Sequence, residues 1–167
     1  MGYLAFNIDA STREKLLGHI PAAYLKTVAD HITIQLTKKP EVLPAAQTID
    51  ILGIADDGNG LQALVVAVDG QRLRPDGKPY HITWSLDPEK MAPADFDPNP
   101  KPEKRKAQHY KPAHSGALVA DHAQKEFIKY FDMPVSLGGA TAVYNEDSPP
   151  QRAPNLDAQL KMRQPNA

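Results

Sequence analysis

HITIQLT (residues 31–37) and YHITWSL (residues 80–86) are the two stretches from which the fold of this chain follows. Both alternate polar and apolar residues, which is typical of a β-strand with one buried face. Because side chains two apart on a strand point to the same side, the histidine and the threonine of each His-Ile-Thr triplet share the polar face. The repeat therefore predicts two strands, each of which presents an imidazole and a hydroxyl group side by side.

Further elements are predicted before, between and after these strands. A strand over residues 3–8 leads into a helix over 11–19, which a capping box at Ser11-Thr12-Arg13-Glu14 opens. Strands are predicted over 48–55 and 61–68, with a turn at residues 56–60 between them. Helical periodicity marks 115–131, and two closing strands, 133–137 and 140–144, flank Gly138-Gly139. The predicted elements thus extend from residue 3 to residue 144.

The chain of 167 residues is long enough to bury one good core, so we expect a single domain over residues 1–146. Residues 87–113 contain six of the 16 prolines and a run of charged side chains. This composition predicts a Pro-rich, basic insert without regular structure. Residues 147–167 are rich in Pro, Gln and Asn, which predicts a loose C-terminal tail.

The composition excludes several classes of protein. Without cysteine the chain has no disulfide, no thiolate metal site and no cysteine nucleophile. A formal net charge of -1 argues against attraction of the whole molecule to long nucleic acid or an anionic membrane. The apolar run at residues 2–8 lacks a basic leader, and no later run is as long as a membrane span. We therefore expect a cytoplasmic protein without membrane association.

The residue types of the two triplets suit the cleavage of a phosphodiester without a metal or cofactor. One group has to take a proton from the nucleophile and another has to give a proton to the leaving oxygen. Histidine can do both near neutral pH, and a nearby threonine hydroxyl can donate to a non-bridging phosphate oxygen. His31 and His81 are therefore the predicted acid-base pair, with Thr33 and Thr83 as phosphate-binding groups. Which histidine is the acid and which the base stays open.

Paired His-x-Thr strands some tens of residues apart resemble the two-histidine (2H) phosphoesterase superfamily. Residues 30–36, DHITIQL, are similar to the first motif of the branch that contains tRNA ligase cyclic phosphodiesterase domains and small phage and bacterial relatives. The resemblance covers residues 1–90 and, more weakly, the strands around Gly138-Gly139. It implies a bilobal α+β fold, with two antiparallel sheets lining a central groove and helices outside, that hydrolyses cyclic phosphates or related phosphodiesters. The long insert after the second motif departs from the family.

Five further residues are candidate substrate contacts. Three flank the triplets, one shares the polar face with His81, and one lies among the basic residues of the insert; they are Tyr24, Lys26, Lys78, Ser85 and Tyr110. Tyr80 also flanks a triplet, but alternation turns it away from His81. The insert itself could hold phosphates through its basic residues, Lys101, Lys104, Arg105, Lys106 and Lys111. A solvated loop is the favoured interpretation of that segment.

Two substrates remain open within this hypothesis. One is a cyclic oligonucleotide signal, as with phage enzymes of this superfamily that disarm host defence, and the other is a 2′,3′-cyclic phosphate at an RNA end. The compact single domain favours the signal.

Two other classes of protein also fit the sequence. A non-catalytic nucleotide-binding protein would sequester the signal in the same site, and an interaction domain would bind a partner through the Pro-rich segment. His109, His114 and His122 lack a recognised ligand spacing, so no metal site is predicted.

Overall fold

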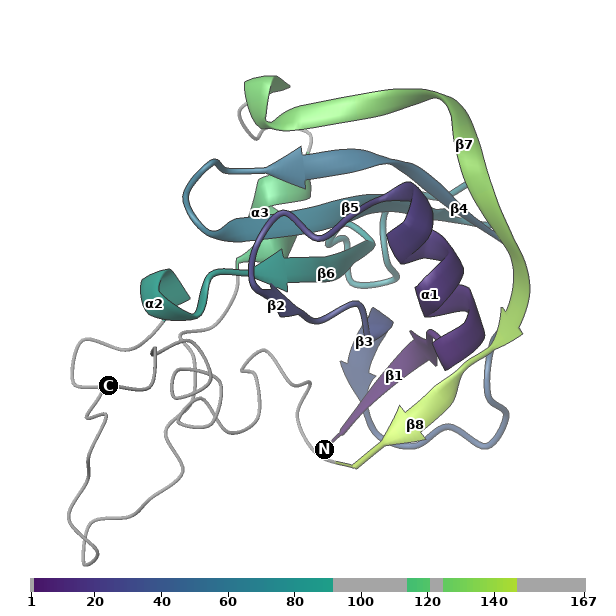
Figure 1. The fold of residues 1–167 in the computed structure, drawn as a ribbon. Helices are drawn as coiled ribbons and strands as arrows, with labels where there is room; N and C mark the ends of the chain where they lie inside the picture. Colours follow the sequence, from purple (N-terminus) through teal and green to yellow (C-terminus); the bar gives the residue numbers. More distant parts are fainter. Residues whose placement is uncertain (1, 92–113, 121–124, 147–167) are drawn as a thin grey trace, which may run out of the picture.

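The computed structural model describes residues 2–91, 114–120 and 125–146 of the chain (Figure 1). The described residues form an α+β fold with two antiparallel sheets, which confirms the coarse fold prediction. In chain order the elements are β1 (Gly2–Asn7), α1 (Ala10–His19), β2 (Lys26–Thr27), β3 (His31–Thr37), β4 (Ala45–Asp56), β5 (Leu61–Val68), β6 (His81–Leu86), α2 (Pro88–Met91), α3 (Ser115–Val119), the 3-10 helix η2 (Lys125–Phe127), β7 (Ile128–Thr141) and β8 (Val143–Asn145). Both HIT strands therefore form as predicted.

The small sheet has the strand order β3-β1-β8, and the large sheet has the order β2-β6-β5-β4-β7. Figure 1 shows β7 running along the large sheet and then bending down to β8 in the small sheet. The bend ends at Ala142, whose N–H donates to the carbonyl of Pro44 at 2.8 Å. Between the described strands the chain thus passes from one sheet to the other four times: through α1, at the β2–β3 and β3–β4 connections, and here.

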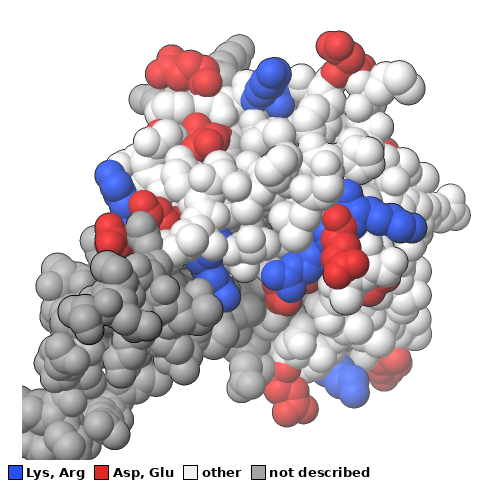
Figure 2. Space-filling model, in the orientation of Figure 1, with Lys and Arg blue, Asp and Glu red and all other residues white. Residues whose placement is uncertain are grey.

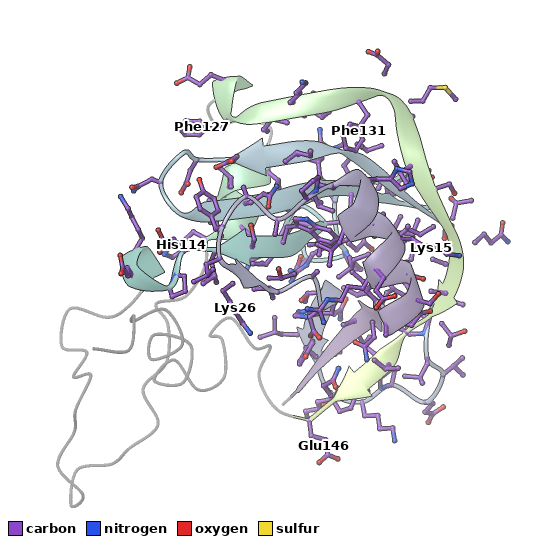
Figure 3. All side chains as sticks on the ribbon, viewed as in Figure 1. Lys15, Lys26, His114, Phe127, Phe131 and Glu146 are labelled. Atoms are coloured by element: carbon purple, nitrogen blue, oxygen red, sulfur yellow. The ribbon has the colours of Figure 1, made fainter. Side chains whose placement is uncertain are left out.

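The main core lies between the sheets and α1. It collects the apolar side chains of both HIT strands, including Ile32, Ile34, Ile82 and Trp84, together with Leu16 of α1. Phe131, on the inner side of β7, packs against the same core (Figure 3). Leu36 differs from the expectation that the apolar face of its strand is buried, because it stands 47% exposed near the end of β3.

A second, smaller core covers the opposite face of the large sheet. Leu118 and Val119 of α3 pack there against Ala63 and Val65 of β5. All eight residues of β5 are consequently buried, because the strand is covered on both faces. Burial of apolar side chains at this second core is what fixes α3 to the sheet.

Helix α1 begins one residue earlier than predicted. The side chain of Asp9 is the N-cap and accepts a hydrogen bond from the N–H of Thr12 at 2.7 Å, so the predicted capping box at Ser11 is wrong. Aspartate serves this position well because its carboxylate satisfies a free N–H of the first turn. At the other end of the helix, the indole N–H of Trp84 donates to the carbonyl of Ile20 at 2.9 Å. Helix and large sheet are therefore joined by a buried hydrogen bond.

Three predictions on the second half of the chain are wrong in part. The helix over 115–131 ends at Val119, and from Ile128 the chain is strand β7, paired with β4. Gly138-Gly139 lies inside β7 and does not separate two strands. Residues 88–91 of the predicted insert form the short helix α2. Residues 92–113 of the insert and the tail at 147–167 lie outside the described residues.

The described surface carries charges of both signs. Figure 2 shows Lys and Arg side chains interspersed with Asp and Glu side chains over the visible face. Within the described ranges, no helix has the length and apolar character needed to cross a membrane.

Candidate functional site

The two sheets meet along the chain segment that contains β2 and β3. Lys26 and Thr27 pair with Leu86 and Ser85 on β6. Beyond the end of β2 the backbone stays beside β6, and the N–H of Ala29 donates to the carbonyl of Thr83 at 3.0 Å. Ala29 is fully buried and has a φ of 43°, a left-handed conformation that turns the chain out of the large sheet. Two residues later the segment enters the small sheet as β3.

This register brings the two histidines together. His31 stands two residues after Ala29, and His81 stands two residues before Thr83. Because β2 and β6 are antiparallel, both steps lead in the same direction from the Ala29–Thr83 hydrogen bond. The electrostatic influence of His31 on His81 agrees with this placement, since His31 contributes to lowering the pKa of His81. The two triplets therefore lie at one junction.

The two triplets also share a backbone detail. Each pairs residue by residue with its neighbour, His31-Ile32-Thr33 with Asn7-Phe6-Ala5 and His81-Ile82-Thr83 with Val65-Leu64-Ala63. In each strand the residue after the threonine, Ile34 or Trp84, is an extra residue without a cross-strand partner. Such a bulge bends a strand and increases its twist. Both strands thus change direction immediately after the His-Ile-Thr triplet.

His81 is held in one tautomer by its backbone contact. Its Nδ1 lies 3.1 Å from the carbonyl oxygen of Pro79. A carbonyl oxygen only accepts, so Nδ1 carries the hydrogen and Nε2 carries the lone pair when the ring is neutral. Burial lowers the pKa of His81, and the positive charge of Arg74 acts in the same direction. A neutral His81 with a free Nε2 lone pair is a proton acceptor.

His31 has a different partner. Its Nδ1 lies 3.0 Å from a carboxylate oxygen of Asp30, and its ring lies 5.6 Å from that of Tyr3, centroid to centroid. The hydrogen bond from His31 holds the pKa of Asp30 below its ordinary value, although burial opposes this. The Asp30 carboxylate therefore stands ready to offset positive charge on a protonated His31. Within the described ranges, no hydrogen bond engages Nε2 of either histidine.

The two threonines differ in their surroundings. The hydroxyl of Thr83 lies 2.8 Å from the hydroxyl of Ser115 at the start of α3. Gly116, the next residue, lies so close to His81 that a Cβ added to it would stand 3.5 Å from Cε1 of the imidazole ring. Thr33 has no such neighbour, and in the described part of the chain its hydroxyl makes no hydrogen bond. One half of the site is thus packed against a helix, whereas the other half has no such helix contact among the described residues.

Two of the predicted substrate contacts, Ser85 and Tyr24, are hydrogen-bonded to other side chains. Ser85 is fully buried and donates to the side-chain carbonyl of Gln62 at 2.6 Å. The hydroxyl of Tyr24 donates to Asp56, and burial together with this contact raises the pKa of Tyr24 to about 12.

Three further candidate contacts are Lys26, Lys78 and Tyr110. Lys26 is partly exposed on β2, Lys78 is exposed in the β5–β6 connection, and Tyr110 lies outside the described residues. Tyr80 is buried in the main core, as alternation predicts.

Sequence reasoning missed five residues of this site: Tyr3, Asp30, Arg74, Ser115 and Gly116. Asp30 had a local signal, since a carboxylate directly before a candidate catalytic histidine is a natural partner for it. The others have none. Ser115 stands 32 residues from Thr83 in the chain, so only the packing of α3 on the large sheet brings them into contact.

Comparison of the chain with protein-family models, with curated protein sequences and with solved structures gives no match. In the part of the chain that the structure describes, no three carboxylate or imidazole side chains are grouped so that they could hold a metal ion. What the arrangement offers is a pair of imidazoles with unengaged Nε2 atoms and two hydroxyl groups.

Proposed function

We propose that this protein is a phosphodiesterase that hydrolyses a small cyclic nucleotide by acid-base catalysis between His31 and His81. The observation that carries the proposal is the register at the sheet junction. His31 and His81 each stand two residues from the hydrogen bond between Ala29 and Thr83, in the same direction along the strands. The resemblance of the paired His-x-Thr strands to 2H phosphoesterases supports it, and the bilobal fold with a central groove is part of the same proposal.

The surroundings of each histidine favour a division of roles. His81 has its lone pair on Nε2 and a lowered pKa, so it is the base that takes a proton from the attacking water. His31 is paired with the carboxylate of Asp30, so it is the acid, and it gives its Nε2 proton to the leaving oxygen. Thr33 and Thr83 would donate hydrogen bonds to the non-bridging oxygens as negative charge builds at phosphorus.

The proposed reaction balances without a further reactant. The water oxygen forms a bond to phosphorus while one of its protons passes to Nε2 of His81. The bond from phosphorus to the leaving oxygen breaks, and that oxygen takes the proton of His31. The products are a phosphomonoester and a free hydroxyl, and a proton moves from His81 to His31 through solvent before the next turnover. On an RNA-type 3′-5′ linkage, the ribose 2′-hydroxyl would replace water as the nucleophile.

The charge of the molecule favours a small substrate over a long polyanion. The formal net charge is -1, and the visible face carries both signs (Figure 2). Binding of long nucleic acid relies on many Lys and Arg contacts to phosphates. We therefore place a cyclic oligonucleotide signal first, in an enzyme that would act against host defence, and a 2′,3′-cyclic phosphate end second.

The direct test is incubation with a panel of 2′,3′-cyclic nucleotides and cyclic di- and trinucleotides in excess EDTA, followed by chromatography. His31→Ala and His81→Ala serve as matched variants, and each should lower turnover about 100-fold or more. Turnover that survives both substitutions, or no turnover of any substrate, would overturn the proposal. Binding of a nucleotide without turnover would instead identify a sequestering protein.

The division of roles has its own test, which uses the leaving group. The 4-nitrophenyl ester of a nucleotide releases a phenolate that departs without a proton, so it does not need an acid. His31→Ala should therefore lose much less activity on this ester than on the cyclic substrate, whereas His81→Ala should lose activity on both. An equal loss on both substrates in the His31 variant would contradict the assignment.

A further inference from the structure

We propose that Ser115 is a positioning residue that orients the hydroxyl of Thr83, so that Thr83 presents its hydrogen to an anionic oxygen of the ligand. The inference rests on the proposed function, because the anionic oxygen belongs to the phosphoryl group of the substrate. It adds to the site a residue from α3, which lies outside both His-Ile-Thr triplets and far from them in the chain.

Helix α3 is held in place by packing that does not involve the two hydroxyls. Leu118 and Val119 are buried against Ala63 and Val65 of β5. These two β5 residues are the cross-strand partners of Thr83 and His81. Cross-strand partners share a face of the sheet, so α3 covers the same face that carries Thr83 and His81. The helix therefore sets the position of Ser115 before any ligand is bound.

The burial and the hydrogen-bond partners of the two hydroxyls decide which of them is the donor. The two hydroxyl oxygens lie 2.8 Å apart, and Ser115 is 1% exposed, whereas Thr83 is partly exposed. In the described part of the chain, Thr83 is the one side chain to which the Ser115 hydroxyl is bonded. If Thr83 donated, the hydrogen of Ser115 would be buried without an acceptor, which is costly. If Ser115 donates, its hydrogen is satisfied and the Thr83 hydrogen remains available to water or a ligand.

The second direction leaves Thr83 as an oriented donor. A hydroxyl that accepts from a fixed neighbour has fewer rotational positions for its own hydrogen, so less freedom is lost when it binds an oxygen. Thr33, for which the described residues provide no such partner, has to be ordered by the ligand itself. The two halves of the site are thus unequal, and Thr83 is the preorganised half.

The test is a double-mutant cycle on binding and turnover. Calorimetric titration with adenosine 2′-monophosphate gives the dissociation constant, and hydrolysis of 2′,3′-cyclic AMP gives kcat and KM. Ser115→Ala should weaken binding by about three- to tenfold, the range that a modest hydrogen bond provides. In a Thr83→Val background the same substitution should have almost no effect, whereas in a Thr33→Val background it should keep its full effect. A purely structural role of Ser115 would weaken binding equally in all three backgrounds.

Equal effects of Ser115→Ala in the Thr83→Val and Thr33→Val backgrounds would overturn the inference. If Ser115→Ala does not fold, Ser115→Cys replaces it in the cycle, because cysteine has a similar shape and only a weak donor. Binding with the expected cycle but without turnover would overturn the proposed function and leave the role of Ser115 intact. Turnover with an additive cycle would overturn the role of Ser115 alone, and the absence of both binding and turnover would overturn both.

Discussion

Replacing Gly116 with valine tests the contact between α3 and His81 without any assumption about the substrate. A Cβ at residue 116 would lie 3.5 Å from Cε1 and 3.8 Å from Nδ1 of His81, which is ordinary van der Waals contact. Alanine should therefore fit. The two methyl groups of valine extend about 1.5 Å beyond Cβ, so a methyl group directed toward His81 would displace the imidazole ring or the helix.

The magnitude follows from two opposing effects. Gly116→Ala should stabilise the protein by about 0.5–1 kcal/mol, because alanine has the higher helix propensity and meets no obstacle. Gly116→Val should destabilise it by about 1–3 kcal/mol, the usual cost of overpacking a packed site. For a chain of this length each kcal/mol corresponds to roughly 2–4 °C in Tm.

Gly18 provides the matched control for these substitutions. It lies in α1, and a Cβ added there would meet nothing within 4 Å. Gly18→Ala and Gly18→Val therefore report helix propensity alone, and both should be neutral or stabilising. The quantity to compare is the difference between the two valine variants.

Chemical and thermal unfolding give the stabilities, and the NMR resonance of the His81 Cε1 proton reports the ring directly. We expect this resonance to move in Gly116→Val and to stay in place in Gly18→Val. If the two valine variants were equally stable and the resonance did not move, α3 would not pack on His81. The proposed packing of α3 against His81 and Thr83, including the role of Ser115, would then be refuted.

Three further outcomes are expected. Because burial lowers the pKa of His81 below 6.5, the unfolded chain binds a proton more readily than the folded one, and folded stability should fall as pH decreases from 6.5. His81→Gln should make this decline shallower in urea unfolding down to about pH 5, and equal slopes would argue against a buried His81. Asp30→Asn should lower kcat about tenfold with little change in KM, because it removes the charge that offsets protonated His31. Steady-state kinetics on a substrate that the enzyme turns over measure this, and an unchanged kcat would remove Asp30 from the mechanism. Ile82→Ala, at a fully buried position, should lower the free energy of unfolding in urea by about 2–5 kcal/mol. Leu36→Ala, at a 47% exposed position, should lower it by under about 1 kcal/mol. Similar losses would contradict the different burial of these two side chains.

The strands and the turn that depend on a local sequence pattern were predicted well. Alternation gave the bounds of β3 to the residue and those of β6 to within one residue, and the glycines at 58 and 60 marked the turn between β4 and β5. A strand with one buried face has to place apolar side chains at every second position, and this requirement is visible in any short window of sequence.

The errors occur where distant strands decide the structure. Residues 128–131 continue a helical pattern, yet they form β7 because β4 offers them a partner. Gly53 of β4 makes this approach close, since a Cβ there would stand 2.5 Å from the carbonyl oxygen of Lys129. Pairing with a neighbour of this kind overrides local propensity, and no window around residue 128 contains it.

The sequence by itself determined which side chains share a face, and so matched His31 with Thr33 and His81 with Thr83. It could not determine that the two pairs meet, because that depends on the left-handed turn at Ala29 and on the register between β2 and β6. It also could not reveal that Ser115 lies beside Thr83 and makes the two halves unequal. Strand register and helix docking are set by contacts between residues far apart in the chain, and only the tertiary structure contains those contacts.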